Sequence, residues 1–267
     1  MTKPDLWFDS AVTRLADPQA FKVWSVIVSL FGDLAQQKGD RVSGTALTAI
    51  LQPMGLKPEA IRVALHRLRK DGWIDSDRIG RGSVHFLTEY GRAQSAAVTP
   101  RIYDEDPAPV PDWHLLIAED GRAADTLNTL LLTEDYIALG RHAALGPGPL
   151  PDDCEDLIGF TTTAHAIPPW LKSRLFPEEL AQASASLRDG ARAVNADKPG
   201  AKILSAVQIA TLRTLVIHRW RRVALRHPVL PPVFLPVDWP EQACRQEVFR
   251  LLNALPRPSV AEINENG

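Results

Sequence analysis

Basic side chains are concentrated in a short segment, residues 58–71, that is predicted to form a helix. Its apolar residues recur on one side at about 100° per residue, which predicts a buried stripe of Ile61, Ala64, Leu65 and Leu68. The basic residues fall on the opposite side, and they are Arg62, His66, Arg69 and Lys70, with Arg67 at the edge. Guanidinium, ammonium and imidazole groups donate hydrogen bonds to phosphates and to base edges. One docked face and one basic face are what a DNA recognition helix needs.

A glycine-flanked turn over residues 77–82 follows this helix and carries two further arginines, Arg78 and Arg81. It is predicted to join strands at residues 73–76 and 83–87. Arginines at such a hairpin tip can approach the phosphate backbone, which gives affinity and register rather than sequence discrimination. The basic helix and hairpin together predict a winged helix-turn-helix. A solvated helix face beside a solvated turn is the alternative for each charge taken singly.

The elements that would position these side chains can be read from local signals. A helix over about residues 43–52, followed by the Pro53-Met54-Gly55 turn, would supply the first half of the helix-turn-helix. Proline suits the first position of the basic helix, and Gly72 is placed to end it. Lys57 precedes this helix, where a short polar cap is usual. Thr88 is predicted to cap the next helix.

Charge and proline content divide the 267-residue chain into three expected domains: 1–98, 99–170 and 171–267. The net charge is +3 over residues 1–100, −10 over residues 101–170 and +5 over residues 171–267. Such blocks often follow domain structure. Pro107, Pro109 and Pro111 are typical of a linker after the first domain. The final residues, 256–267, are predicted to be a frayed tail.

Several classes of protein are disfavoured by the sequence. The two cysteines, Cys154 and Cys244, are too few for a disulfide framework, and no apolar run is long enough for a membrane span, so a cytoplasmic location is expected. We find no nucleophile-elbow, phosphate-loop, dinucleotide or zinc-protease motif. The chain is therefore predicted to be no enzyme and to hold no metal or cofactor.

The middle segment is predicted to alternate strand, helix, strand, strand, at residues 114–118, 123–132, 136–145 and 158–163, which suits a split α+β unit. Its acidic loop contains Asp152, Asp153, Glu155 and Asp156. Clustered carboxylates could hold Mg²⁺, so a metal-dependent nuclease is the alternative function. A solvated acidic loop explains the same residues. A protein-interaction module is a third hypothesis, because some winged helices bind proteins.

Two stretches resemble the PaaX-type repressors of phenylacetic acid degradation. The first runs over residues 55–73 and continues through 78–91; the second comprises residues 215–223, 227–231 and 235–240. The resemblance implies an α+β fold with an N-terminal winged helix-turn-helix, a ferredoxin-like middle domain and a helical C-terminal domain. It implies a homodimer that represses from double-stranded operator DNA with an inverted repeat. It also implies release by an aryl-CoA thioester such as phenylacetyl-CoA.

A helix over residues 205–226 is the expected place for dimerisation and effector sensing. One face carries an apolar stripe, Ile209, Leu212, Val216, Trp220 and Val223, suited to a dimer interface or a bundle core. The other face is rich in arginine. Planar guanidinium groups suit the phosphates of an acyl-CoA, so His218, Arg221 and Arg222 are the predicted effector-binding residues. Structural ion pairs with the acidic middle domain are the alternative.

Overall fold

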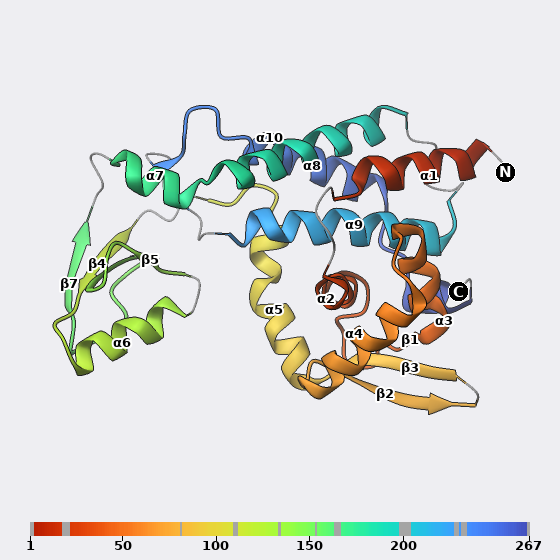
Figure 1. Ribbon diagram of the computed structural model, residues 1–267, viewed down its shortest axis with the longest axis horizontal. Coiled ribbons are helices and arrows are strands. Elements are labelled where there is room, and N and C mark those ends of the chain that lie inside the picture. The colour runs from red at the N-terminus through yellow and green to blue at the C-terminus, as the bar shows by residue number, and fades with distance from the viewer. Residues whose placement is uncertain are drawn as a thin grey trace. The chain divides into compact units, whose positions relative to one another are not determined.

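The chain has an α+β architecture in which helices outnumber strands (Figure 1). The computed structural model describes residues 3–17, 22–80, 82–108, 112–132, 135–152, 154–162, 167–197, 204–226, 230 and 234–265. It divides into two compact units. The first contains residues 1–105, 183–223 and 241–267, and the second contains residues 106–182 and 224–240. The helices of the C-terminal segment, expected from the sequence as a domain of their own, are shared between these units.

The first unit combines a small sheet with most of the helices. Its strands are β1 (Val42–Ser43), β2 (Ile74–Ile79) and β3 (Gly82–Leu87). Its helices are α1 (Lys3–Leu15), α2 (Val23–Leu34), α3 (Gly44–Leu51), the 3-10 turn η1 (Gln52–Met54), α4 (Pro58–Lys70), α5 (Glu89–Tyr103), most of α8 (Glu178–Asp197), nearly all of α9 (Ala206–Ala224), α10 (Glu241–Ala254) and α11 (Val260–Glu265).

Helix α9 lies at the centre of the first unit. Every residue from 209 to 220 is buried, so this helix is enclosed on all sides. The predicted apolar stripe is confirmed as buried, and Trp220 is fully inaccessible, with its indole Nε1 donating to the Ile102 carbonyl at 2.9 Å. A helix buried all round belongs to the core of a bundle. Of the two roles expected for its apolar stripe, the bundle core is the one that its burial supports.

The ends of α3, α4 and α5 are fixed by local capping. Ser43 caps α3 by accepting a hydrogen bond from the Ala46 N–H at 3.1 Å, whereas Lys57 at the N-cap of α4 makes no side-chain cap bond. Helix α4 ends in a left-handed Gly72, whose N–H and that of Trp73 donate to the Arg69 and Leu68 carbonyls. This pair of bonds is a Schellman motif. The predicted cap Thr88 is confirmed, because its hydroxyl accepts from the Gly91 N–H at 3.0 Å.

The strands of the first unit form an antiparallel sheet in the order β1-β3-β2. Ile79 pairs with Gly82, so only residues 80 and 81 separate β2 from β3. Gly80 adopts a φ of 59°, which suits a tight hairpin turn. The predicted six-residue turn is therefore wrong in extent. Pairing continues nearly to the tip and places Arg78 within β2, opposite Ser83.

Part of the predicted frayed tail is helical, and the prediction is wrong for residues 260–265. These residues form α11, whose Ile263 is completely buried. The Asn264 amide accepts from the Ser43 N–H at 2.9 Å and donates to the Arg41 carbonyl at 2.7 Å. Asn264 thus hydrogen-bonds the edge of β1 as a neighbouring strand would.

The second unit contains an antiparallel sheet in the order β5-β6-β4-β7. Its elements are β4 (Trp113–Ile117), α6 (Arg122–Leu131), β5 (Ile137–Ala138), β6 (Ala143–Pro147), β7 (Ile158–Thr162) and α7 (Pro169–Leu175). Where one strand was predicted over residues 136–145, a turn separates β5 from β6. Three residues of the predictions lie outside the described residues: Pro109 and Pro111 of the predicted linker, and Thr163 at the end of the predicted last strand.

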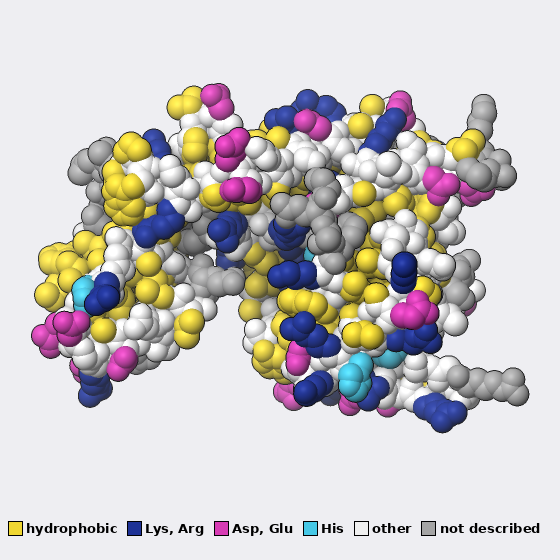
Figure 2. All heavy atoms as spheres, in the orientation of Figure 1, with side chains coloured by type: hydrophobic (Ala, Val, Ile, Leu, Met, Phe, Trp, Pro, Cys, Tyr) yellow, Lys and Arg dark blue, Asp and Glu magenta, His cyan; other side chains and the backbone are white. Residues whose placement is uncertain are grey.

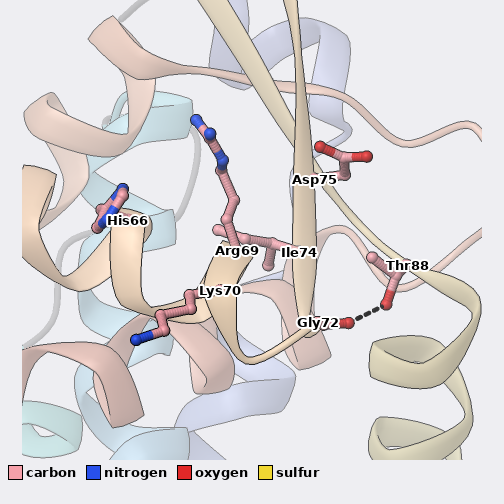
Figure 3. Close-up of a pocket in the computed structure, with 7 residues that line it drawn as sticks. All are labelled: His66, Arg69, Lys70, Gly72, Ile74, Asp75 and Thr88. Atoms are coloured by element: carbon pink, nitrogen blue, oxygen red, sulfur yellow. Dashed lines mark hydrogen bonds between the residues drawn. The ribbon is translucent and has the colours of Figure 1, made fainter.

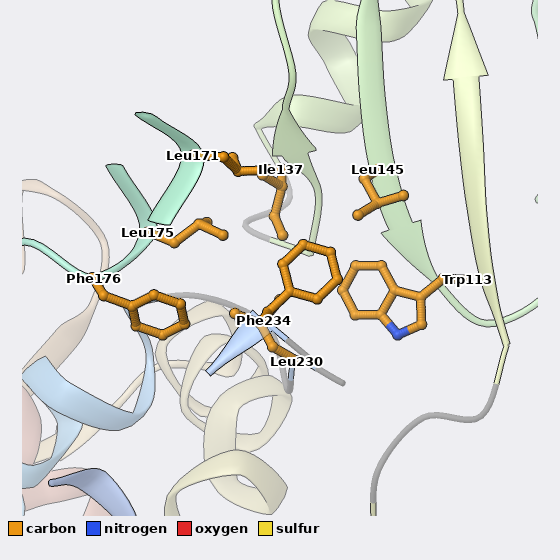
Figure 4. Close-up of a cluster of buried hydrophobic side chains, with 8 residues drawn as sticks. All are labelled: Trp113, Ile137, Leu145, Leu171, Leu175, Phe176, Leu230 and Phe234. Atoms are coloured by element: carbon orange, nitrogen blue, oxygen red, sulfur yellow. The ribbon is translucent and has the colours of Figure 1, made fainter. Parts of the chain in front are cut away.

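Two apolar clusters hold the second unit together. One contains Leu116 and Leu127, and joins β4 to α6. In the other, side chains from the sheet and α7 gather with Leu230 around Phe234, which stacks on Trp113 at a centroid distance of 5.9 Å (Figure 4). Among the described helices, none combines the length and apolar character needed to cross a membrane.

Candidate nucleic-acid interface

Helix α4 is attached by one face and exposed on the other. Its buried residues are the four of the predicted stripe, Ile61, Ala64, Leu65 and Leu68, and the stripe packs toward α2 and α3. All five predicted basic residues on this helix are exposed: Arg62, His66, Arg67, Arg69 and Lys70. Figure 2 shows Lys and Arg side chains over α4 and the β2–β3 hairpin, interspersed with carboxylates. The structure thus presents these basic groups on one accessible surface.

The ion pairs on this surface are local and solvated. Arg62 lies 3.0 Å from Glu59, and Arg67 lies 3.5 Å from Asp71, each within one turn of helix. Exposed helical pairs of this kind contribute only about 0.3–0.5 kcal/mol, because water screens them. These guanidinium groups can therefore exchange an intramolecular carboxylate for a phosphate at small cost.

The C-terminal end of α4 and strand β2 enclose an open pocket of about 530 Å³ (Figure 3). His66, Arg69 and Lys70 line it together with Asp75, and Lys70 extends away from β2. The Arg69 guanidinium donates to the Ser76 hydroxyl at 3.3 Å and thereby bridges the helix and the hairpin. Arg69 consequently helps to set the hairpin position as well as adding charge.

Of the two basic residues predicted for the hairpin, the structure describes one. Arg78 is exposed on β2, whereas Arg81 lies outside the described residues. Near the other end of the hairpin, the Arg41 guanidinium lies 3.7 Å from the Phe86 ring centroid and 3.7 Å from the Asp77 carboxylate. Sequence reasoning missed Arg41, because only the pairing of β1 with β3 brings it there. It also missed Val63, which is 70% exposed on α4.

Helix α2 is the support on which α4 packs, and a buried charged network holds α2 to the rest of the unit. Asp33 of α2 accepts two hydrogen bonds of 2.8 Å from Arg213 of α9, and one of 2.6 Å from the Tyr103 hydroxyl of α5. Arg257 also contacts Asp33, at 3.3 Å. The Asp33 side chain is 0% exposed and that of Arg213 is 6% exposed. This network ties α2, α5 and α9 together.

Two of the three predicted effector residues of α9, His218 and Arg221, contact α2. His218 is buried, and its Nδ1 lies 3.2 Å from the Ser29 hydroxyl, which also accepts from Arg221 at 3.3 Å. Arg222 is exposed and forms an ion pair with Asp17. The structure brings His218 and Arg221 together on one α2 residue. A ligand could reach the His218 ring only if the packing of α2 on α9 opened, and effector binding by all three stays a prediction.

Acid is expected to destabilise the fold through His218. Burial, and then the charges of Arg222 and Arg221, lower the pKa of His218 from 6.5 to about 4. Between these values the unfolded chain binds a proton that the folded chain excludes. The contribution of neutral His218 to the free energy of unfolding is therefore complete above pH ~6.5. It falls toward pH ~4, by up to about 1.4 kcal/mol per pH unit.

Urea unfolding of the His218→Gln variant at about pH 7 and about pH 4.5 tests this linkage. The glutamine can keep a hydrogen bond to Ser29 but does not titrate, so the variant should lose less stability in acid than the unsubstituted chain. His66→Gln, a change of the exposed histidine on α4, is the control and should keep the full acid sensitivity. Equal sensitivity of the two variants would contradict the role of His218.

The acidic loop of the second unit does not gather metal ligands among its described residues, which leave out Asp153. Asp156 instead pairs with Arg122 at 2.9 Å. In the parts of the chain that the structure describes, no group of three His, Cys, Asp or Glu side chains is placed to hold an ion. Among the described residues, no geometry favours the nuclease alternative.

Comparison with known proteins places the two resembling stretches in one family. A family model described as PaaX-like protein matches residues 22–91, and one described as PaaX-like protein C-terminal domain matches residues 177–263. The transcriptional repressor PaaX of Escherichia coli is 27% identical in an alignment of 263 positions that covers 91% of this chain and 83% of the repressor. A solved structure, the uncharacterized protein Rv0674 from Mycobacterium tuberculosis, is similar in fold with a TM-score of 0.50 and 23% identity, covering 91% of this chain and 97% of that one.

Proposed function

Because this chain belongs to the PaaX-like family, we propose that it is a transcriptional repressor that binds double-stranded operator DNA through α4. The observation that carries the proposal is the geometry of this helix. Four apolar residues hold α4 in the first unit, and all its basic residues face solvent. The matched repressor from Escherichia coli, which aligns over nearly the whole chain, supports the same conclusion.

In this proposal α3, η1 and α4 are the helix-turn-helix, and the β2–β3 hairpin is its wing. Gly55 adopts a φ of 80°, which suits the turn between the two helices. Helix α4 would enter the major groove, where His66 and Lys70 can donate to base edges. Arg62, Arg67 and Arg69 would contact the flanking phosphates, and Arg78 and Arg81 would reach the backbone from the wing.

The second unit and the oligomer belong to the same proposal. The order β5-β6-β4-β7, with antiparallel pairing throughout, is that of a ferredoxin-like sheet, which supports this assignment for the middle domain. Where that fold has its second crossover helix, the described residues between β6 and β7 form bends, short turns and irregular structure. A homodimer would place two α4 helices on an inverted repeat, and an aryl-CoA thioester such as phenylacetyl-CoA would release them.

Selection from random double-stranded DNA with the full chain tests the proposal. We expect enrichment of an inverted repeat with half-sites about one helical turn, ~34 Å, apart. Affinity for the enriched DNA should fall steeply with salt, since each neutralised phosphate releases counterions. A scrambled duplex of the same composition is the control. No enrichment, or weak binding that is insensitive to salt, would contradict DNA recognition and favour a protein partner.

A further inference from the structure

Val63 is an aliphatic side chain at the centre of the basic surface of α4. It is 70% exposed, while the other large aliphatic residues of this helix, Ile61, Leu65 and Leu68, are at most 8% exposed. A single exposed valine on a protein surface normally needs no explanation. This one, however, occupies a helical position where a β-branched residue is unfavourable and where it gains little burial in return.

The surroundings of Val63 direct it toward base edges rather than phosphates. At about 100° per residue, Glu59, His66 and Lys70 share the outward row with Val63. Arg62 and Arg69 lie on one flank of this row, and Arg67 lies on the other. Flanking guanidinium groups reach the two walls of a groove, so the row between them faces its floor. Glu59, whose carboxylate is 72% exposed one turn before Val63, would be repelled by a phosphate there.

The floor of the major groove offers a specific apolar partner. Thymine carries a methyl group on its exposed edge, whereas the other base edges present hydrogen-bond donors and acceptors. We propose that Val63 contacts a thymine methyl group in each half-site and so selects an A·T pair at that position. This inference rests on the proposed function and adds to it the base that one residue reads.

Deoxyuridine provides a test, because it differs from thymidine only by the missing methyl group. The probe is the duplex that the unsubstituted chain enriches from random DNA, with each thymidine replaced singly by deoxyuridine. At one position in each half-site, the replacement should weaken binding about fourfold, the effect of one methyl contact. Val63→Ala should weaken binding to the unmodified duplex and should show no further loss on the deoxyuridine duplex.

Val237→Ala is the matched control, since Val237 is fully exposed on the second unit. It should bind like the unsubstituted chain and keep its sensitivity to deoxyuridine. If each deoxyuridine replacement weakens DNA binding of Val63→Ala by the same factor as it weakens binding of the unsubstituted chain, the inference is overturned while the proposed function stands. If the unsubstituted chain enriches no DNA, the proposed function fails, and this inference fails with it.

Discussion

Replacing Arg213 with leucine is expected to lower the free energy of unfolding by about 3–5 kcal/mol, the usual result of removing one partner of a buried ion pair. Arg213 donates two 2.8 Å hydrogen bonds to Asp33, and two more to the Leu252 and Leu255 carbonyls. Leucine would leave a completely buried carboxylate with only Tyr103 and the half-exposed Arg257 beside it. Urea unfolding measured by circular dichroism gives the loss directly.

Arg250→Leu is the control for that substitution. Arg250 pairs with Glu247 at 3.5 Å, but its side chain is 65% exposed. Water already screens this pair, so its loss should cost at most about 1 kcal/mol. A similar loss for the two variants would mean that the Asp33 network does not hold α2 in place.

Replacing Arg62 and Arg69 together with alanine is expected to weaken DNA binding by on the order of a hundredfold, since each charge-assisted hydrogen bond to a phosphate contributes about 1.5–3 kcal/mol. Both residues lie on the same flank of α4, and both are exposed. Binding to the enriched duplex would be measured by gel retardation at fixed salt. The salt dependence should also become shallower, because fewer phosphates are neutralised.

The control is the double variant Arg122→Ala, Arg141→Ala. It changes the net charge by the same amount as the Arg62/Arg69 variant, but on the second unit, where both residues are exposed. This pair should leave DNA binding within a small factor of the unsubstituted chain. The thermal unfolding of both double variants should stay close to that of the unsubstituted chain, since neither removes a core residue. Retained binding by the Arg62/Arg69 variant would remove α4 from DNA recognition.

The geometry of α4 could be predicted from the sequence because its signals are local. The buried stripe follows from helical periodicity within one short segment, and Gly72 ends the helix through bonds to residues less than two turns away. The exposure of Val63 follows from the same angular count. Its place on the basic side is visible in the sequence once every position of the helix is considered.

The surroundings of α9 could not be predicted in this way, because they depend on distant partners. Its arginine-rich face was expected to meet an effector or the acidic middle domain. Of its arginines, Arg213 binds an aspartate 180 residues earlier, and Arg219 donates to the Leu15 carbonyl and to Ser186, while effector binding by Arg221 and Arg222 stays a prediction. No periodic pattern within α9 identifies these partners. The same limit applies to α11, whose docking on β1 joins residues 221 positions apart in the sequence.

The docking of α11 also has a consequence for biosynthesis. The surface proposed to read DNA is built on a unit of three segments, residues 1–105, 183–223 and 241–267, which the two segments of the second unit separate in the sequence. A nascent chain that has emerged only as far as β3 still lacks α9, which fills the core, and Asn264, which closes the sheet edge. A chain interrupted between β3 and α9, by premature termination or by proteolysis, would therefore lack the core and the closed sheet edge on which the proposed DNA-binding surface is built.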